Sequence, residues 1–241
     1  MTSVEIALPV YNEEQQLVES VELLQTTIMA EKYSSFAISI CIINNASTDN
    51  TPRLAEEIAQ THKNVKVLHI PKKGRGVALM TCWLKSNAEI LSYMDIDLSA
   101  DLQNLKDLLD TVAGNEADLA VGSRLAKGAQ IEGRTPLRGL MSRGYNLLIK
   151  ALFATHFSDA QCGFKAVSRQ SFHRLAPLIR NRNWFFDSEM LIIAEKVGMR
   201  IKDIPVVWTD DPGSTVKVLG TITEDILGLL RLVRTKPWET A

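Results

Sequence analysis

The fold of this chain is decided by one stretch, Leu91-Ser92-Tyr93-Met94-Asp95-Ile96-Asp97-Leu98-Ser99, in which an apolar run ends in two carboxylates. If the strand continues through them, Asp95 and Asp97 point to the same face, because side chains alternate along a strand. Two like charges at that spacing repel, and a divalent cation that prefers oxygen ligands relieves the repulsion. Ligands of open α/β sheets bind at the carboxyl ends of strands, where this pair falls. The stretch therefore predicts a strand that ends in a metal site.

The same stretch has a second interpretation, in which Asp97 or Ser99 caps a helix over residues 101–112. The Asp-x-Asp pattern alone is too short to distinguish a metal site at a strand end from a helix cap. The choice depends on whether the rest of the chain supplies a diphosphate for the metal to hold.

Composition is typical of a globular protein. The 241 residues are 46% hydrophobic, enough for one large α/β domain or two small ones. A net charge of −1 offers no overall attraction to nucleic acid, so no nucleic-acid partner is expected. Cys41, Cys82 and Cys162 are odd in number and lack zinc-ligand spacing, which indicates reduced thiols and a cytoplasmic protein. No signal peptide is visible, and no apolar run approaches the roughly 18 residues of a spanning helix.

Strands and helices alternate through the first half of the chain. Strands are expected at residues 4–10, 36–43, 65–70 and 89–94. Helices are expected at 15–30, from the polar turn at 44–51 to residue 60, and at 77–87. Four such units favour an α/β fold with a Rossmann-like, mostly parallel sheet, helices on both faces and right-handed crossovers. The first half therefore has the pattern of a nucleotide-binding half.

The second half is less regular. We expect a short strand at 119–124, a mobile loop at 125–136 and a helix at 137–157. A loop and strand at 159–167, a helix at 184–197, a strand at 199–207 and a helical tail at 216–233 follow. Since no repeat or linker is visible, we predict a single domain.

Polar loops follow all four strands of the first half and should meet at one edge of the sheet. They come after Val10, at 44–49, at 72–75 and at 95–99. Backbone N–H groups after the first two strands can hold a base and ribose, while Lys72, Lys73 and Arg75 supply positive charge for phosphate. In isolation the basic loop would be a solvated turn; beside an acidic metal site, phosphate binding is favoured. A dinucleotide site is disfavoured, because the first turn lacks Gly-x-Gly-x-x-Gly.

Eight blocks of sequence carry a family resemblance. They are residues 8–14 (LPVYNEE), 45–49 (NASTD), 73–76 (KGRG), 94–99 (MDIDLS), 122–124 (GSR), 142–146 (SRGYN), 159–165 (DAQCGFK) and 184–187 (WFFD). In this order they resemble family-2 glycosyltransferases, and among them the dolichyl- and polyprenyl-phosphate glucose or mannose synthases. The resemblance implies a GT-A fold, a nucleotide-sugar donor and an Mg²⁺ or Mn²⁺ ion. It divides the domain into a nucleotide-sugar-binding half (1–125), an acceptor half (126–215) and a C-terminal helix (216–241).

The resemblance also assigns roles to residues of the donor site. Donor binding falls on Pro9, Tyr11, Glu13, Asn45, Asp49, Lys73, Arg75, Asp95 and Arg124. Asn45 stands where many members have Asp, which leaves a UDP-sugar and a GDP-sugar both open. Metal binding falls on Asp95, Asp97 and Ser99, the last at a position where mannose synthases often have a Gln. A serine hydroxyl is shorter, so it would reach the ion through water.

Acceptor binding falls on Ser142 and Arg143 in the same way. Arg143 has the stronger mechanistic reason, because a guanidinium can hold a phosphate with two parallel hydrogen bonds. The alternative is a surface arginine on an amphipathic helix. A basic position of the family near residues 208–216 is less clear, since Thr215 stands where a basic residue is common.

The predicted mechanism depends on the acceptor. An ionised polyprenyl phosphate can attack the anomeric carbon without a general base, so the enzyme aligns it and stabilises the departing nucleoside diphosphate. A hydroxyl acceptor would instead need a carboxylate to take its proton, and Asp187 or Glu189 is the candidate. Both could also simply complement a helix N-terminus. The expected catalytic residues are thus Asp97, Arg143, Asp187 and Glu189.

These observations predict an inverting, metal-dependent transferase that moves a hexose, glucose rather than mannose, to a polyprenyl phosphate. The alternatives are a soluble transferase acting on a hydroxyl and a nucleotide-sugar-binding module without turnover. The helix at 137–157 carries an apolar stripe with basic residues, and the tail does the same, which favours peripheral docking on the inner face of the membrane. The apolar positions of the tail are Leu219, Ile222, Ile226, Leu229 and Val233, and Arg231, Arg234 and Lys236 are expected to meet anionic lipid. Either stripe could instead pack on the sheet.

Overall fold

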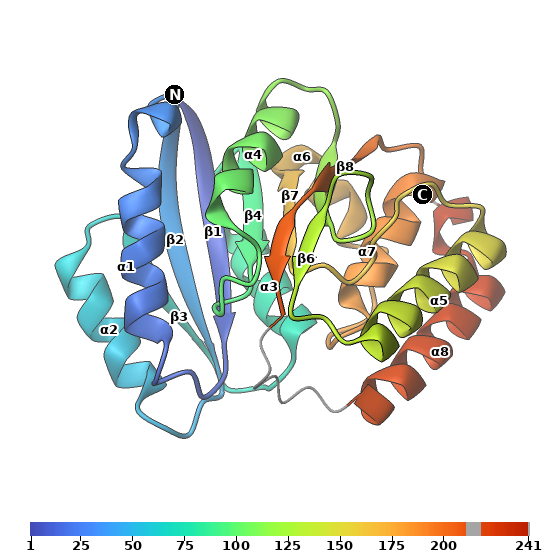
Figure 1. Ribbon diagram of the computed structural model, residues 1–241, viewed down its shortest axis with the longest axis horizontal. Helices are drawn as coiled ribbons and strands as arrows, with labels where there is room; N and C mark the ends of the chain where they lie inside the picture. The colour runs from blue at the N-terminus through green and yellow to red at the C-terminus, as the bar shows by residue number, and fades with distance from the viewer. Residues whose placement is uncertain (211–217, 241) are drawn as a thin grey trace.

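The computed structural model describes residues 1–210 and 218–240 (Figure 1). The strands are β1 (Thr2–Val10), β2 (Phe36–Asn45), β3 (Val65–Ile70), β4 (Ile90–Met94), β5 (Leu119–Ser123), β6 (Gln130–Glu132), β7 (Phe164–Ser168), β8 (Ile201–Pro205) and β9 (Val207–Thr209). The α-helices are α1 (Leu17–Ile28), α2 (Thr51–Thr61), α3 (Arg75–Lys85), α4 (Leu105–Ala113), α5 (Pro136–Phe153), α6 (Arg169–Leu175), α7 (Phe186–Lys196) and α8 (Val218–Thr235). Three 3₁₀ turns are η1 (Glu31–Tyr33), η2 (Leu102–Asn104) and η3 (Pro237–Thr240).

A seven-stranded sheet with the order β3-β2-β1-β4-β7-β5-β8 runs through the molecule. All neighbouring strands are parallel except β7, which is antiparallel to both β4 and β5. The mostly parallel sheet predicted from the βαβ spacing is therefore confirmed. The carboxyl ends of β1 to β4 lie at one edge, which places the polar loops of the first half together (Figure 1).

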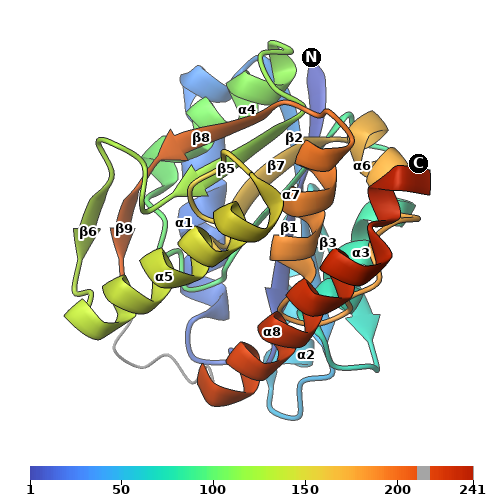
Figure 2. The same cartoon turned by 90° about the vertical axis from the view of Figure 1, so that its right-hand side faces the viewer.

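Helices cover both faces of the sheet, as expected. Consecutive strand residues alternate between two buried clusters, so that Ile6 belongs to one and Ala7 to the other. The first cluster includes side chains of α1, α2 and α4, and the second includes Trp83 of α3, Phe172 of α6 and Met190 of α7. Helix α8 packs against α5 and α7 and lies beside α5 at the outside of this second layer (Figure 2).

The expectation of a mobile loop at 125–136 is wrong in part. Residues Gln130–Glu132 form β6, which pairs in parallel with β9 and so receives hydrogen bonds from a segment more than 70 positions away. Arg134 adds an ion pair to Asp210, with 3.2 Å between Nε and Oδ2. The single strand expected at 199–207 is two strands, because the chain leaves the main sheet at Val206 and joins β6. Local periodicity could not reveal this partner.

Two further helix predictions need correction. Helix α6 was not expected; it has only seven residues, and its start is stabilised by Ser168, whose side chain accepts a hydrogen bond from the Ser171 N–H. The helix expected over 101–112 is the turn η2 followed by α4. The cap belongs to Asp101, which accepts from the Gln103 N–H, rather than to Asp97 or Ser99.

Candidate functional site

Four loops follow β1 to β4, and we call them the donor loops (residues 11–14, 45–50, 71–74 and 95–99). The first three are hydrogen-bonded to one another. Asn12 joins the first to the second, because its Oδ1 accepts from the Thr48 N–H at 2.8 Å. Asn45 joins the second to the third: its Nδ2 donates to the Lys72 carbonyl at 2.9 Å, and its Oδ1 accepts from the Gly74 N–H at 2.7 Å. The structure thus brings together the loops that the sequence placed at one edge.

Three of these loops contain a non-glycine residue in the left-handed region. The φ angles are 57° at Asn12, 63° at Ala46 and 48° at Leu98. Such conformations cost free energy and persist where the surroundings impose them, which is common at ligand sites. The backbone of the donor loops is therefore held in one particular shape.

Asp95 and Asp97 lie in a turn beyond β4, because the strand ends at Met94. The expectation that they share one face of a strand is therefore wrong. The Leu98 N–H donates to the Asp95 carbonyl at 3.2 Å, and the Ser99 N–H donates to Oδ1 of Asp97 at 3.0 Å. Asp95 is half-buried, Asp97 is exposed and Ser99 is buried. Asp97 is therefore the most exposed of the three.

Four carboxylates gather here. Burial is the main reason that the pKa of Glu13 is raised, and the nearby Asp97, Asp49 and Asp95 add to the effect. Burial likewise raises the pKa of Asp95, against the opposing pull of Arg75. At Asp49 burial is outweighed by hydrogen bonds from Thr51 and Glu14, which hold its pKa below the usual range. This crowding of oxygen ligands fits a hard divalent cation such as Mg²⁺ or Mn²⁺.

Arg75 is the centre of the charge network behind these carboxylates. Its Nη2 lies 2.7 Å from Oδ1 of Asp95, and its Nε lies 3.5 Å from Oδ2 of Asp187. The rings of Tyr93 and Trp184 flank the guanidinium, with centroids 5.1 and 5.4 Å from Cζ. Arg75 therefore holds two carboxylates in this structure, and contact with a donor phosphate stays a prediction.

Lys165 and Tyr93 complete the network and were not singled out from the sequence. The Lys165 ammonium is buried, 3.0 Å from Asp187 Oδ1, and donates to the Tyr93 hydroxyl at 3.2 Å. Tyr93 in turn donates to Asp187. A lysine inside an otherwise apolar strand, β7, is the signal that could have identified this position.

Gly163 allows the network to close. The Asp95 N–H donates to its carbonyl at 3.1 Å. A Cβ at this position would stand 1.8 Å from Oδ2 of Asp95 and 2.8 Å from Nη2 of Arg75. Any side chain here would displace the carboxylate. Gly163, like Lys165, lies in the block at 159–165 but had no predicted role.

The two candidate bases, Asp187 and Glu189, are buried at the start of α7. Glu189 accepts hydrogen bonds from the N–H groups of Arg180 and Asn181 at 3.2 and 2.6 Å, and pairs with Arg231 of α8 at 2.9 Å. The Glu189 carboxylate therefore links the loop at residues 180–181 to α8. Asp187 is bound by Lys165, Tyr93 and Arg75, as described above. Both carboxylates are thus buried and occupied by protein partners.

The predicted phosphate-binding residues of the second half are spread out. Arg124 is paired in bidentate fashion with the buried Asp159, with 2.7 Å between Nε and Oδ2 and 3.0 Å between Nη2 and Oδ1. Arg143 is exposed on α5, and Ser142 is half-buried beside it. Their phosphate-binding roles stay predictions, and Arg124 would have to be shared with Asp159.

Residues 145 and 146 connect α5 to the site. The Tyr145 hydroxyl donates to Ser188 Oγ at 2.8 Å, next to Asp187, and the Ala160 N–H donates to Asn146 Oδ1 at 2.8 Å. The last two residues of the motif at 142–146 therefore contact Ser188 and Ala160, which are the sequence neighbours of Asp187 and Asp159.

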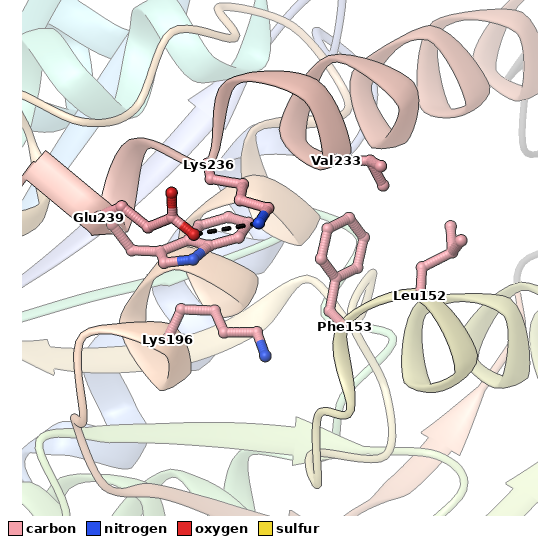
Figure 3. Close-up of a pocket in the computed structure, with 7 residues that line it drawn as sticks. Leu152, Phe153, Lys196, Val233, Lys236 and Glu239 are labelled. Carbon is pink, nitrogen blue, oxygen red and sulfur yellow. Dashed lines mark ion pairs between the residues drawn. The ribbon is translucent and has the colours of Figure 1, made fainter.

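A cavity of about 280 Å³ lies elsewhere, between the ends of α5, α7 and α8 (Figure 3). Its lining consists of Leu152, Phe153, Lys196, Val233, Lys236, Trp238 and Glu239. None of these belongs to the predicted site, so the volume of this cavity says nothing about the donor.

Comparisons with known proteins agree with the sequence blocks. The sequence model of the family described as "Glycosyl transferase family 2" matches residues 5–176. Glycosyltransferase AglD of Haloferax volcanii is 33% identical over 231 residues, which make up 94% of this chain and 35% of AglD. Dolichyl-phosphate beta-glucosyltransferase ALG5C of Trichomonas vaginalis is 30% identical over 225 residues, 89% of this chain and 66% of that protein. The chain thus spans about a third of AglD and about two thirds of ALG5C.

Solved structures show the same fold. Glucosyl-3-phosphoglycerate synthase from Mycobacterium tuberculosis in complex with UDP has a TM-score of 0.71 at 19% identity, covering 96% of this chain and 80% of that chain. The same synthase with Mn²⁺, UDP-glucose and phosphoglyceric acid has a TM-score of 0.69 at 16% identity, over 96% and 79% of the two chains. The GT-A fold implied by the sequence blocks is confirmed.

Proposed function

Because this chain belongs to glycosyl transferase family 2, we propose that it is a hexosyltransferase that moves glucose, with inversion, from a nucleoside-diphosphate donor to a polyprenyl phosphate. The similarity to a dolichyl-phosphate beta-glucosyltransferase over 89% of the chain supports this acceptor class. The observation that carries the proposal is the burial of Asp187 and Glu189, each bound by cationic or N–H groups.

The burial of Asp187 and Glu189 favours a phosphate acceptor over a hydroxyl acceptor. A hydroxyl nucleophile needs a base within hydrogen-bond reach of its proton, and both candidate carboxylates are turned toward protein partners. A phosphate monoester is already an anion at neutral pH, so it needs only alignment and a neighbouring cation. Arg143, exposed on α5, is the residue that we assign to this phosphate, with Ser142 beside it.

We assign the metal to Asp95 and Asp97, with Glu13 and Asp49 adding negative charge around it. When bound, an Mg²⁺ or Mn²⁺ ion supplies Lewis-acid stabilisation of the departing diphosphate. The chain's own contribution is to hold the oxygens in place, because Arg75 anchors Asp95 and the turn from Asp95 to Ser99 fixes Asp97. Ser99 is buried, so its proposed contact would be indirect. Tyr11 and Lys73 form the rim of the donor site, with the ammonium 3.3 Å from the ring centroid.

We also propose that the acceptor side docks on the cytoplasmic surface of a membrane. Helices α5 and α8 lie side by side (Figure 2). They expose apolar side chains, which we call the apolar face. Its members are Leu137, Leu140, Met141, Leu147, Leu148 and Leu152 of α5 and Ile222, Ile226, Leu227, Leu230 and Val233 of α8. Lys196 and Lys236 border it at the cavity of Figure 3. Within the described residues, no helix combines the length and apolarity needed to cross a bilayer.

Two details of the predicted tail stripe are corrected by the structure. Leu229, which was expected on the same stripe as Ile226, is buried against the core. Arg231, which was expected to meet anionic lipid, is instead paired with Glu189. The side chain of Leu219 lies outside the described residues. The apolar face therefore keeps Ile222, Ile226 and Val233 of the predicted stripe but not Leu229.

The proposal is tested by incubating the protein with UDP- and GDP-hexoses, Mn²⁺ and either undecaprenyl phosphate or undecaprenol, the matched acceptor without phosphate. We expect a glycolipid with the phosphate only, and with a UDP- or GDP-glucose donor. Transfer to undecaprenol or to a soluble sugar at an equal rate would favour the hydroxyl-acceptor transferase. Donor binding without any product would favour a binding module.

A further inference from the structure

A second group of potential metal ligands lies inside the molecule, away from the carboxyl ends of the strands. Glu5 of β1, Cys41 of β2 and Cys82 of α3 are all buried, and one ligand atom of each lies within 4.8 Å of the others. The Cys82 Sγ is 3.2 Å from Oε1 of Glu5. Glu5 and Cys41 point to the face of the sheet that α3 covers, so three elements contribute to the group.

We propose that Glu5, Cys41 and Cys82 form a binding site for a thiophilic divalent cation of the Zn²⁺ class. Zn²⁺ binds thiolate sulfur at about 2.3 Å and carboxylate oxygen at about 2.1 Å, so ligands around one ion stand about 3.5–4 Å apart. In the observed group one pair stands 3.2 Å apart and all pairs lie within 4.8 Å, so a cation would have to draw only the longer separations together. Three protein ligands leave one tetrahedral position for water.

Lys66 makes the charges balance. Its ammonium pairs with Oε2 of Glu5, which leaves Oε1 directed at Cys82. Two thiolates and one carboxylate carry three negative charges, and a divalent cation with the Lys66 ammonium carries three positive ones. A buried site is tolerated when its charges cancel in this way. The Lys66 side chain is 53% exposed, so it also marks the side from which an ion can enter.

Binding requires both thiols to release their protons. Without a cation, contact with Cys41, burial and the neighbouring Glu5 raise the pKa of the Cys82 thiol. A bound cation reverses this preference, because it stabilises the thiolates as ligands while the two protons leave to solvent. The sulfur ligands distinguish this site from the all-oxygen group at Asp95 and Asp97, which suits Mg²⁺ or Mn²⁺.

The site would join three elements that support the donor loops. It links β1 and β2 to α3, and α3 begins at Arg75, the residue that anchors Asp95. A cation here should therefore stabilise the folded chain without contacting the donor.

The experiment is a titration of the reduced protein with Cd²⁺, a spectroscopic substitute for Zn²⁺, in excess Mg²⁺. We expect one equivalent of Cd²⁺ to produce a thiolate-to-metal charge-transfer band and to raise the Tm. Cys82→Ser and Cys41→Ser should lose both signals, and Glu5→Gln should weaken binding at least tenfold. Cys162→Ser, the matched control at the third buried cysteine, should keep them. Asp97→Asn should also keep them, since it changes only the oxygen site.

A variant-free measurement covers the case in which a cysteine variant does not fold. Cd²⁺ should protect Cys41 and Cys82, but not Cys162, from slow alkylation of the native protein, read by peptide mass mapping. A missing band in wild type, an unchanged band in Cys82→Ser, or equal protection of all three cysteines would each overturn the proposal.

Discussion

The first three donor loops are hydrogen-bonded to one another and the fourth is held by the ion pair of Asp95 with Arg75, whereas the apolar face of α5 and α8 presents leucine and isoleucine side chains to solvent. At the donor loops, Asn12 accepts through its Oδ1 from the second loop, Asn45 uses both ends of its amide to reach the third, and Arg75 joins two carboxylates. On the apolar face, Leu140 and Leu147 are each more than 60% exposed. The first region has the order expected of a site for a polar ligand that must be aligned, and the second has the composition of a surface that another apolar phase covers.

The largest effect should come from the donor loops. Asp97→Asn removes charge where the cation should bind, so we expect turnover to fall about 10²–10³-fold, with loss of Mn²⁺-dependent donor binding. Because Asp97 is exposed, the Tm should not change. Asp101→Asn is the matched control, since its acceptor oxygen for the Gln103 N–H remains. Full activity of Asp97→Asn, or of wild type in EDTA, would contradict the metal assignment.

Glu189→Gln tests whether the buried carboxylate of α7 supports the structure or takes a proton. The change breaks a buried ion pair with Arg231, which should cost about 3 kcal/mol of stability. Turnover per folded molecule with a lipid phosphate should stay within tenfold, whereas a general base would lose about 10²–10⁴-fold. Thermal unfolding and initial rates separate the two, with Glu195→Gln on the same helix as control.

Gly163→Ala places a methyl group against Asp95 and Arg75. We expect a loss of about 1–3 kcal/mol of stability together with weaker donor binding, because the carboxylate must move. Gly144→Ala on α5 is the control, since a Cβ there meets nothing within 4 Å. Donor titration and chemical unfolding measure the two effects. Equal behaviour of the two variants would remove the special role assigned to Gly163.

Asp225, on the inner side of α8, should give the fold a dependence on pH. Burial raises the pKa of Asp225 from its ordinary value of 3.8 to about 6. The folded state therefore holds this proton more tightly, and the stability that Asp225 contributes falls as pH rises from about 4 to about 6. Asp225→Asn should raise stability at pH 7 by about 1–2 kcal/mol and flatten the profile. Urea unfolding at several pH values measures this dependence. A steeper pH profile of the unfolding free energy in Asp225→Asn than in wild type would contradict the prediction.

The smallest effect should be seen on the apolar face. Replacing Leu140 and Leu147 with serine should lower co-sedimentation with anionic liposomes severalfold and leave the Tm unchanged, because both side chains are exposed. Leu23→Ser on α1 is a control of comparable exposure on the opposite layer. If all three proteins sediment alike, the apolar face is not the membrane contact.

The sequence by itself determined the sheet, the positions of most helices and the four donor loops. Alternation between strands and helices is a local property, and the carboxyl ends of neighbouring parallel strands must meet at one edge. The ordered blocks also sufficed for the family. The positions of Asp95, Asp97 and Glu13 in these loops follow from the sequence, because each comes within three residues of the end of a strand, and their binding roles stay predictions.

The tertiary structure decided which partner each charged side chain has. Arg124 pairs with Asp159, Glu189 with Arg231, and Cys82 approaches Glu5 from 77 positions away. It also decided that β4 ends before Asp95 and that residues 130–132 form a strand. Such pairings depend on long-range packing, and the periodicity of a segment carries information only about the face it buries and not about the residue it meets there.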